Sequence, residues 1–203
     1  MSEYSVTTID LLRHGLPEGG EIFRGTTNVQ LTAIGFEQMV QATEKLASSD
    51  VIITSPLQRC ASFAEHAASV VMPNASYHED AGLREVSFGD WDGMTFQDVE
   101  AQYGDQYHHY WRDPVNNTPP NAEPIAEFLE RISLTIQTLA QAYKGQHLLL
   151  VTHGGVIRAA LSYALGCELS SLMRYEVPYA SISQIKIYHT DDDLFPQLVF
   201  HNR

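Results

Sequence analysis

The stretch TTIDLLRHG, residues 7–15, contains a short apolar run that stops at an arginine, a histidine and a glycine. Such a run is typical of a buried strand followed by a turn. The same pattern recurs at Val51–Thr54, which leads into Ser55-Pro56, and at residues 147–152, which lead into His153-Gly154-Gly155. We therefore expect three short buried strands, each followed directly by polar or turn-forming residues.

Amphipathic segments separate these strands and predict helices. Thr32 has the side chain of an N-cap and precedes apolar residues at helical spacing, and a second long periodic segment runs from 125 to about 143. Two more strands are expected near the carboxyl end, at 181–189 and 195–201. Strands that alternate with helices indicate an α/β fold, here a three-layer αβα sandwich whose mostly parallel sheet carries helices on both faces.

The length of 203 residues suits one domain, which we assign to residues 1–203. A segment at about 90–124 interrupts the alternation of strands and helices. Its first part, 95–112, is rich in aromatic residues and predicts one helix, whereas residues 113–124 contain four prolines and three asparagines and predict a surface loop. We expect this segment to form a helical and looped cap inserted into the domain.

Charge and cysteine content narrow the class of protein. The formal net charge is −13, and nucleic acids and anionic membranes bind clustered Lys and Arg, so neither is expected as a partner. Cys60 and Cys167 have neither CxxC spacing nor the density of a secreted scaffold and predict reduced thiols. With no signal-peptide pattern at the amino end, we expect a cytoplasmic protein. The oligomeric state is left open, a homodimer included.

Two histidines and two arginines follow the predicted strands. The carboxyl ends of parallel strands meet at one edge of a sheet, and ligands of α/β folds bind there. This edge would hold Arg13, His14, Arg59 and His153. Helix amino termini at the same edge favour anions, and nine of the twelve cationic residues are Arg, which suits fixed recognition of phosphate. The sequence therefore predicts a phosphate-binding site.

Four motifs occur in an order that resembles the histidine phosphatase (phosphoglycerate mutase-like) superfamily over nearly the whole chain. They are LRHG at 12–15, TSPLQR at 54–59, LRE at 83–85 and THGG at 152–155. Three stretches are most similar to the α-ribazole phosphatase branch: GEIFRGTTN at 20–28, SPLQRC at 55–60 and VSFGDWDG at 86–93. The resemblance implies a phosphatase that needs no metal or cofactor and hydrolyses α-ribazole 5′-phosphate, a phosphate monoester, in the assembly of the cobalamin nucleotide loop.

The resemblance also implies a role for each matching residue. His14 would attack the phosphorus atom and form a phosphohistidine, which water then hydrolyses. Arg13, Arg59 and His153 would hold the phosphoryl oxygens, because phosphoryl transfer is catalysed mainly by positioning and electrostatics. Glu85 would protonate the leaving alkoxide and then accept a proton from the incoming water.

Other residues are expected near the substrate. Gly154 belongs to the phosphate-binding turn. Arg24 and Thr26 lie on a glycine-rich loop, residues 16–28, and each could either contact the substrate or be solvated. The aromatic residues, among them Trp91 and Trp111, could stack on a flat base of the substrate or pack in a second small core, and the sequence favours neither.

Two alternatives belong to the same superfamily: a broad-specificity phosphatase and a phosphoglycerate mutase. Mutases follow RHG with a Ser and an Asn, where this chain has Leu16-Pro17-Glu18, and they carry cations after the glutamate that hold a second phosphate. Here only Arg112 lies in that part of the chain, which favours hydrolysis.

A non-catalytic phosphate-binding protein would lack one of the residues that the resemblance assigns to catalysis, and this sequence contains all of them. A metal site at His108-His109 with Asp105 is disfavoured because neighbouring helix residues point in different directions.

Overall fold

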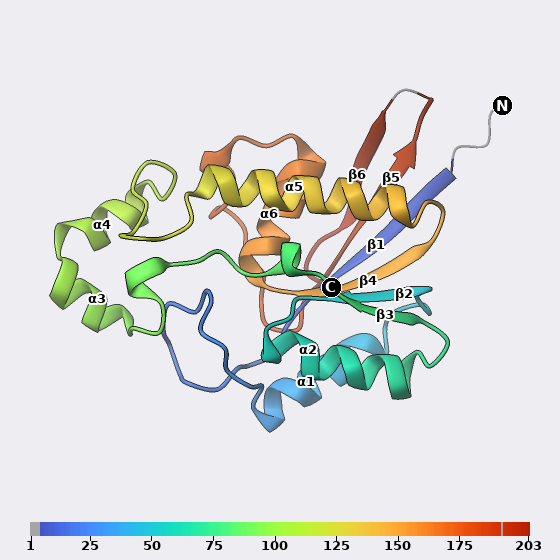
Figure 1. Ribbon diagram of the computed structural model, residues 1–203, viewed down its shortest axis with the longest axis horizontal. Coiled ribbons are helices and arrows are strands. Elements are labelled where there is room, and N and C mark those ends of the chain that lie inside the picture. Colours follow the sequence, from blue (N-terminus) through green and yellow to red (C-terminus); the bar gives the residue numbers. More distant parts are fainter. Residues whose placement is uncertain (1–4, 192) are drawn as a thin grey trace.

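The computed structural model describes residues 5–191 and 193–203 and contains one six-stranded sheet (Figure 1). Its strands are β1 (Ser5–Arg13), β2 (Val51–Thr54), β3 (Ser76–Glu79), β4 (His147–Thr152), β5 (Ile182–His189) and β6 (Leu194–Phe200). Across the sheet they run in the order β3-β2-β4-β1-β5-β6. The first four are parallel, and β5 and β6 add an antiparallel pair beside β1. The predicted mostly parallel α/β fold is confirmed.

Helices cover both faces of this sheet, as the sequence predicts. On one face lie α1 (Ala33–Thr43) and α2 (Gln58–His66), and on the other lie α5 (Ile125–Ala142) and α6 (Gly154–Leu165) (Figure 1). Successive side chains of a strand point to opposite faces, so Leu148 and Leu150 of β4 pack toward α5 and α6, whereas Leu149 and Val151 pack toward α1 and α2. Full burial of each such side chain contributes about 1.5–3 kcal/mol.

Local signals place the helix ends. Thr32 caps α1 by accepting a hydrogen bond from the Gly35 N–H at 2.9 Å, and Gly166 ends α6 in the left-handed conformation, with φ 62°. Helix α2 continues as a π-helical turn over Ala67–Val71. The helical spacing of Cys60, Phe63, Ala64, Ala67 and Val71 predicts that all five side chains face inward. For Val71 this prediction is wrong, because the π-helical turn directs it outward and 37% of its surface is exposed.

The cap segment contains two helices where the sequence predicts one. They are α3 (Phe96–Tyr103) and α4 (Asp105–Arg112), and both lie beyond the amino end of α5, away from the sheet (Figure 1). Gly104 separates them with φ 49° and ψ −112°, a backbone conformation open mainly to glycine. Buried residues Phe23, Trp91, Val99 and Tyr110 form a small core of their own here. The extent of the insertion, about 90–124, stays a prediction.

Short 3-10 turns complete the fold at Ala81–Leu83, Gly89–Trp91 and Leu169–Ser171. Within the described residues, every helix is too short or too polar to cross a bilayer.

Candidate active site

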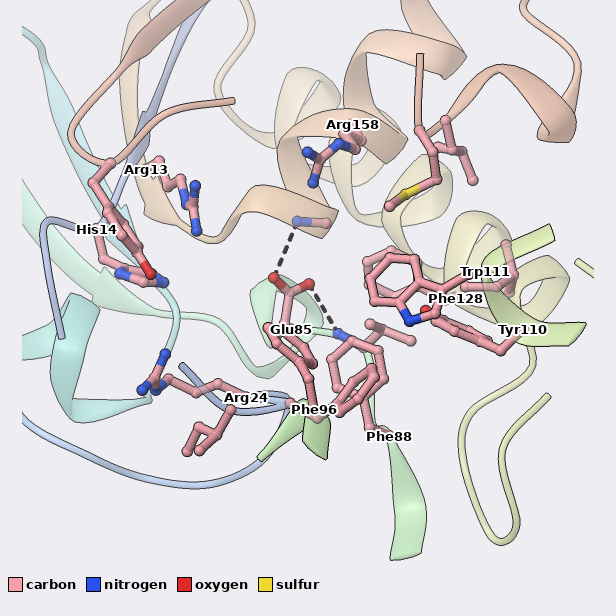
Figure 2. A pocket seen from close by; sticks show the side chains of 18 residues that line it. Arg13, His14, Arg24, Glu85, Phe88, Phe96, Tyr110, Trp111, Phe128 and Arg158 are labelled. Carbon is pink, nitrogen blue, oxygen red and sulfur yellow. Dashed lines mark hydrogen bonds between the residues drawn. The ribbon is translucent and has the colours of Figure 1, made fainter. Parts of the chain in front are cut away.

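A cavity of about 340 Å³ opens where β1 ends and α6 begins, under the cap segment (Figure 2). One part of its lining is charged or polar: Arg13, His14, Arg24, Glu85, Gly155, Arg158 and Tyr179. The other part is apolar and largely aromatic: Ile22, Phe23, Val86, Phe88, Phe96, Tyr110, Trp111, Ile125, Phe128, Leu172 and Met173. The cavity therefore suits a ligand with an anionic end and an apolar end.

His14 follows β1 directly and lines the cavity while only 4% of its surface is exposed. Its Nδ1 lies 2.8 Å from the carbonyl oxygen of Gly15. A carbonyl only accepts, so Nδ1 carries the proton and Nε2 keeps its lone pair. Burial and the nearby Arg59 guanidinium hold the pKa of His14 well below its usual range. The imidazole is therefore neutral near neutral pH, the state that a nucleophile needs.

His153 and Arg59 lie behind His14, and both are fully buried. The ring centroids of the two histidines are 5.3 Å apart. Arg59 Nε donates to His153 Nδ1 at 3.2 Å, so the proton of this imidazole is on Nε2, which donates to Ser55 Oγ at 2.7 Å. Burial and Arg59 also lower the pKa of His153 far below its ordinary value. The structure thus brings together the three residues that the sequence derives from three different strand ends.

Neither of these two residues reaches the cavity wall, however. Arg59 also donates to three backbone carbonyls of the glycine-rich loop, to Thr27 at 2.8 Å, to Gly25 at 2.9 Å and to Arg24 at 3.4 Å. It therefore fixes that loop and sets the electrostatic field at His14. Direct contact of Arg59 or His153 with phosphoryl oxygens stays a prediction.

Arg13 does line the cavity, beside the nucleophile. Its Nη1 donates to the carbonyl of Val177, and its Cζ lies 4.1 Å from the centre of the Tyr179 ring, a cation–π contact. That ring is also 5.7 Å from the ring of His14. Ala180, which follows, has a left-handed φ of 55° and donates its N–H to the carbonyl of His14 at 3.2 Å. A non-glycine residue in this conformation costs roughly 1–2 kcal/mol, so the segment is held against strain next to the site.

Arg24 and Thr26 differ although both lie on the glycine-rich loop. Arg24 lines the cavity, and its Nη2 donates to the carbonyls of Glu18 and Gly20 at 2.9 and 2.6 Å. Thr26 lies outside the lining, and its N–H and hydroxyl both donate to Asp92 at 2.9 and 3.0 Å. The geometry supports substrate contact for Arg24 and offers no support for Thr26.

Glu85 lines the cavity from the segment after the Ala81–Leu83 turn. Its two oxygens accept hydrogen bonds from the N–H groups of Gly155 and Val86, each at 3.0 Å (Figure 2). Gly155 is in the first turn of α6, where free N–H groups and the helix dipole stabilise an anion. A Cβ on Gly155 would collide with this carboxylate, which explains the glycine. Gly154, just before it, lies beneath the Arg13 guanidinium.

Comparison with known families identifies the chain at this point. A family model described as the histidine phosphatase superfamily, branch 1, matches residues 9–195. This chain belongs to that superfamily. The resemblance that the four motifs predict is confirmed.

Individual proteins that are similar to this chain have several different activities. A bifunctional protein of Mycobacterium tuberculosis is 31% identical over 187 residues, which are 90% of this chain and 50% of that protein. A 2,3-bisphosphoglycerate-dependent phosphoglycerate mutase of Bartonella bacilliformis is 26% identical over 179 residues, covering 84% of this chain and 87% of the mutase. The α-ribazole phosphatase structure from Shigella flexneri superposes with a TM-score of 0.83 and 25% identity, covering 97% of this chain and 96% of the other. The chain thus spans about half the length of the first of these relatives, and relatives with different reactions share its fold.

Three residues at or near the site of this superfamily member are not predicted from the sequence: Arg158, Tyr179 and Asp92. Arg158 is one helical turn beyond Gly154, a spacing that could have indicated it. Tyr179 comes from the connection before β5, which has no recognisable pattern. Asp92 lies within the quoted stretch 86–93, but nothing in that stretch reveals what the carboxylate binds.

Asp92 holds the loop that carries Arg24. Its oxygens accept hydrogen bonds from the backbone N–H groups of Gly25, Thr26, Thr27 and Phe88 and from both threonine hydroxyls, at 2.8–3.1 Å. Burial opposes the charge, yet these hydrogen bonds outweigh burial and lower the pKa of Asp92 overall.

Asp92→Asn should therefore loosen this loop. An amide nitrogen accepts no hydrogen bond, so about half of these donors lose their acceptor, and we expect the free energy of unfolding to fall by about 2–3 kcal/mol. Urea unfolding measures this loss. Asp90→Asn is the matched control, because exposed Asp90 accepts one side-chain bond, from Asn121. Equal stability of the two variants would contradict the assignment.

The two buried histidines of the site, His14 and His153, also predict how stability depends on pH. In the folded enzyme His14 and His153 have a lowered pKa, whereas in the unfolded chain both bind protons below their ordinary pKa of 6.5. Acidification below that pH therefore favours the unfolded state, by up to about 1.4 kcal/mol per pH unit for each histidine. Urea unfolding in phosphate-free buffer from neutral to mildly acidic pH should show a shallower dependence for His14→Ala than for the wild type. An identical dependence would show that His14 protonates equally in both states.

Proposed function

We propose that this histidine phosphatase is a phosphomonoesterase that works through a phosphohistidine on His14 and that its substrate is α-ribazole 5′-phosphate. The observation that carries the proposal is the cavity itself. At one end it offers the free lone pair of a neutral imidazole among guanidinium groups, and at the other end an apolar, aromatic wall. A phosphate ester of a ribosylated flat ring matches both ends.

The reaction then has two steps. The Nε2 lone pair of His14 attacks phosphorus, the ester P–O bond breaks, and Glu85 delivers a proton to the leaving alkoxide. In the second step water attacks the phosphohistidine, Glu85 takes back a proton, and the N–P bond breaks to release phosphate. Arg13 and Arg24 line the cavity beside His14 and neutralise charge on the phosphoryl oxygens, so no metal ion is required by this scheme.

Aromatic residues favour this substrate over smaller esters. Trp111 and Phe96 face the cavity with Phe88 and Phe128 (Figure 2), and a flat, apolar ring buries its faces well against such a wall. Trp91 is fully buried in the small core of the cap, whereas Trp111 lines the cavity, which supports Trp111 as the residue that stacks on the flat ring.

A substrate panel tests the proposal. The purified enzyme is assayed with α-ribazole 5′-phosphate, ribose 5-phosphate, adenosine 5′-monophosphate, 3-phosphoglycerate and p-nitrophenyl phosphate, and acid-labile, base-stable label is sought on the protein. We expect the highest kcat/KM for α-ribazole 5′-phosphate. Equal values for every ester would indicate a broad-specificity phosphatase, and interconversion of phosphoglycerates would indicate a mutase.

A further inference from the structure

Arg158 lines the cavity but has no part in the two chemical steps above. It lies on α6, and a Cβ placed on Gly154 would be 3.3 Å from Arg13 Nε and 3.5 Å from Arg158 Nη1. The guanidinium groups of Arg13 and Arg158 therefore flank the same glycine. In the view of Figure 2, Arg158 lies between Arg13 and the aromatic side chain of Trp111. It thus occupies the junction between the charged and the apolar parts of the cavity.

Tyr175 holds this arginine from two directions. Its hydroxyl donates to the backbone carbonyl of Arg158 at 2.6 Å, and its own carbonyl accepts from Arg158 Nε at 3.3 Å. Ser162 Oγ lies 3.4 Å from the same hydroxyl. A side chain fixed in this way loses little further conformational freedom when it binds a ligand.

The outer nitrogens of Arg158 are available. Within residues 5–191 and 193–203, neither Nη atom donates to a protein acceptor and no carboxylate lies within 4 Å of the guanidinium. Both Nη atoms therefore present N–H groups without a protein partner, in the fork geometry that suits two neighbouring oxygens.

The balance of charges in the cavity indicates that Arg158 has a different role from Arg13 and Arg24. Arg13, Arg24 and Arg158 face a single carboxylate, Glu85, in a chain whose net charge is −13. In the first chemical step Glu85 carries the proton that it delivers and is uncharged, so a phosphoryl dianion beside His14 balances Arg13, its neighbour in sequence, and Arg24. Arg158 then remains for the part of the substrate that follows the ester oxygen.

We propose that Arg158 binds the two neighbouring hydroxyl oxygens of the sugar in the leaving group and thereby selects ribosyl phosphates over phosphates without that diol. This inference rests on the proposed function, because it places the ribose between the phosphoryl site and the aromatic wall. It does not depend on which flat ring the ribose carries.

The test compares two nucleotides that differ only in the diol, adenosine 5′-monophosphate and 2′,3′-dideoxyadenosine 5′-monophosphate. For the wild type we expect kcat/KM to favour the diol by about 10- to 100-fold, since a donor pair that loses its acceptors is left unpaired. Arg158→Met should reduce this ratio to within about threefold of one, and Arg158→Lys should also lower it, because an ammonium lacks the fork. Arg174→Met, at an exposed position between α6 and β5, is the control and should keep the wild-type ratio.

Each result decides one point. A wild-type ratio near one, or an unchanged ratio in both Arg158 variants, overturns the inference. A selective loss of activity toward 3-phosphoglycerate in Arg158→Met, with the diol ratio intact, also overturns it and assigns Arg158 to a carboxylate. If the diol ratio collapses as expected but α-ribazole 5′-phosphate is no better than adenosine 5′-monophosphate, the role of Arg158 stands and the proposed substrate fails. Thermal unfolding of each variant shows whether it is folded. If Arg158→Met does not fold, the diol ratio of Arg158→Lys decides the test.

Discussion

His14→Ala should lower kcat for hydrolysis of phosphate monoesters by on the order of 10⁴- to 10⁶-fold, the range seen when a catalytic nucleophile is removed. No other side chain that lines the cavity offers a neutral nitrogen lone pair, and Cys60, the buried thiol nearby, is not part of the lining. Burial raises the pKa of the Cys60 thiol and keeps it protonated, so it is no substitute nucleophile. Steady-state assays with p-nitrophenyl phosphate and α-ribazole 5′-phosphate measure the loss.

The fold should survive this substitution. Among residues 5–191 and 193–203, the His14 side chain makes one hydrogen bond, to the carbonyl of the adjacent Gly15, so its removal breaks no link between distant segments of this part of the chain. Thermal unfolding and circular dichroism check this, and His109→Ala, a surface histidine of α4, is the matched control. If folded His14→Ala retained wild-type activity, or if it still acquired acid-labile label from substrate, another residue would be the nucleophile.

Strand ends were the most predictable part of this molecule. An apolar run that stops at a polar residue fixes where a strand ends, and parallel strands bring their ends to one edge regardless of the loops between them. His14, Arg59 and His153 could therefore be placed together from the sequence. Helix α5 was predictable for a similar reason, since its apolar face repeats at helical spacing over five turns.

Other features depend on partners far away in the sequence, which no local pattern encodes. Asp92 holds the loop of Gly25 through N–H groups that lie 65 to 67 residues before it in the sequence. Tyr179 reaches Arg13 because the connection before β5 returns to the end of β1. The break between α3 and α4 depends on the positive φ of Gly104. A glycine within a helical pattern is compatible both with one continuous helix and with two helices, so the sequence does not predict the break.

For Arg59 the structure adds a second role to the one that the sequence predicts, and the predicted contact with phosphate stays a prediction. The sequence predicts that the Arg59 guanidinium binds phosphate, because a cation at a helix start is unfavourable next to the positive end of the helix dipole unless an anion is bound there. In the structure Arg59 is fully buried and donates to His153 and to loop carbonyls, so its charge acts on the imidazoles from behind. Burial is the main cause of the lowered pKa of both histidines, and the Arg59 charge lowers it further, which keeps the nucleophile neutral.

Glu85→Gln should separate the two chemical steps. With an alkyl ester such as α-ribazole 5′-phosphate, we expect kcat to fall by about 10²- to 10⁴-fold, because an amide delivers no proton to the leaving alkoxide. With p-nitrophenyl phosphate the leaving phenolate needs no proton, so formation of the phosphohistidine should stay fast. Attack of water on that intermediate still requires a base, which the amide does not provide. The variant should therefore accumulate phosphohistidine and release p-nitrophenolate in a burst of about one equivalent per enzyme.

Stopped-flow assays measure the burst, and acid-labile label on the protein measures the intermediate. Glu127→Gln, at an exposed position in the first turn of α5, is the control for loss of a carboxylate and should show neither effect. The Gln side chain keeps one carbonyl oxygen for the N–H of Gly155 or Val86, so the start of α6 should remain in place. Equal losses for the alkyl and the phenyl ester, without a burst, would mean that Glu85 positions α6 or the substrate and transfers no proton. A burst with the phenyl ester alone would instead assign both proton transfers to this carboxylate, since only the loss of an acid slows the first step selectively and only the loss of a base traps the second.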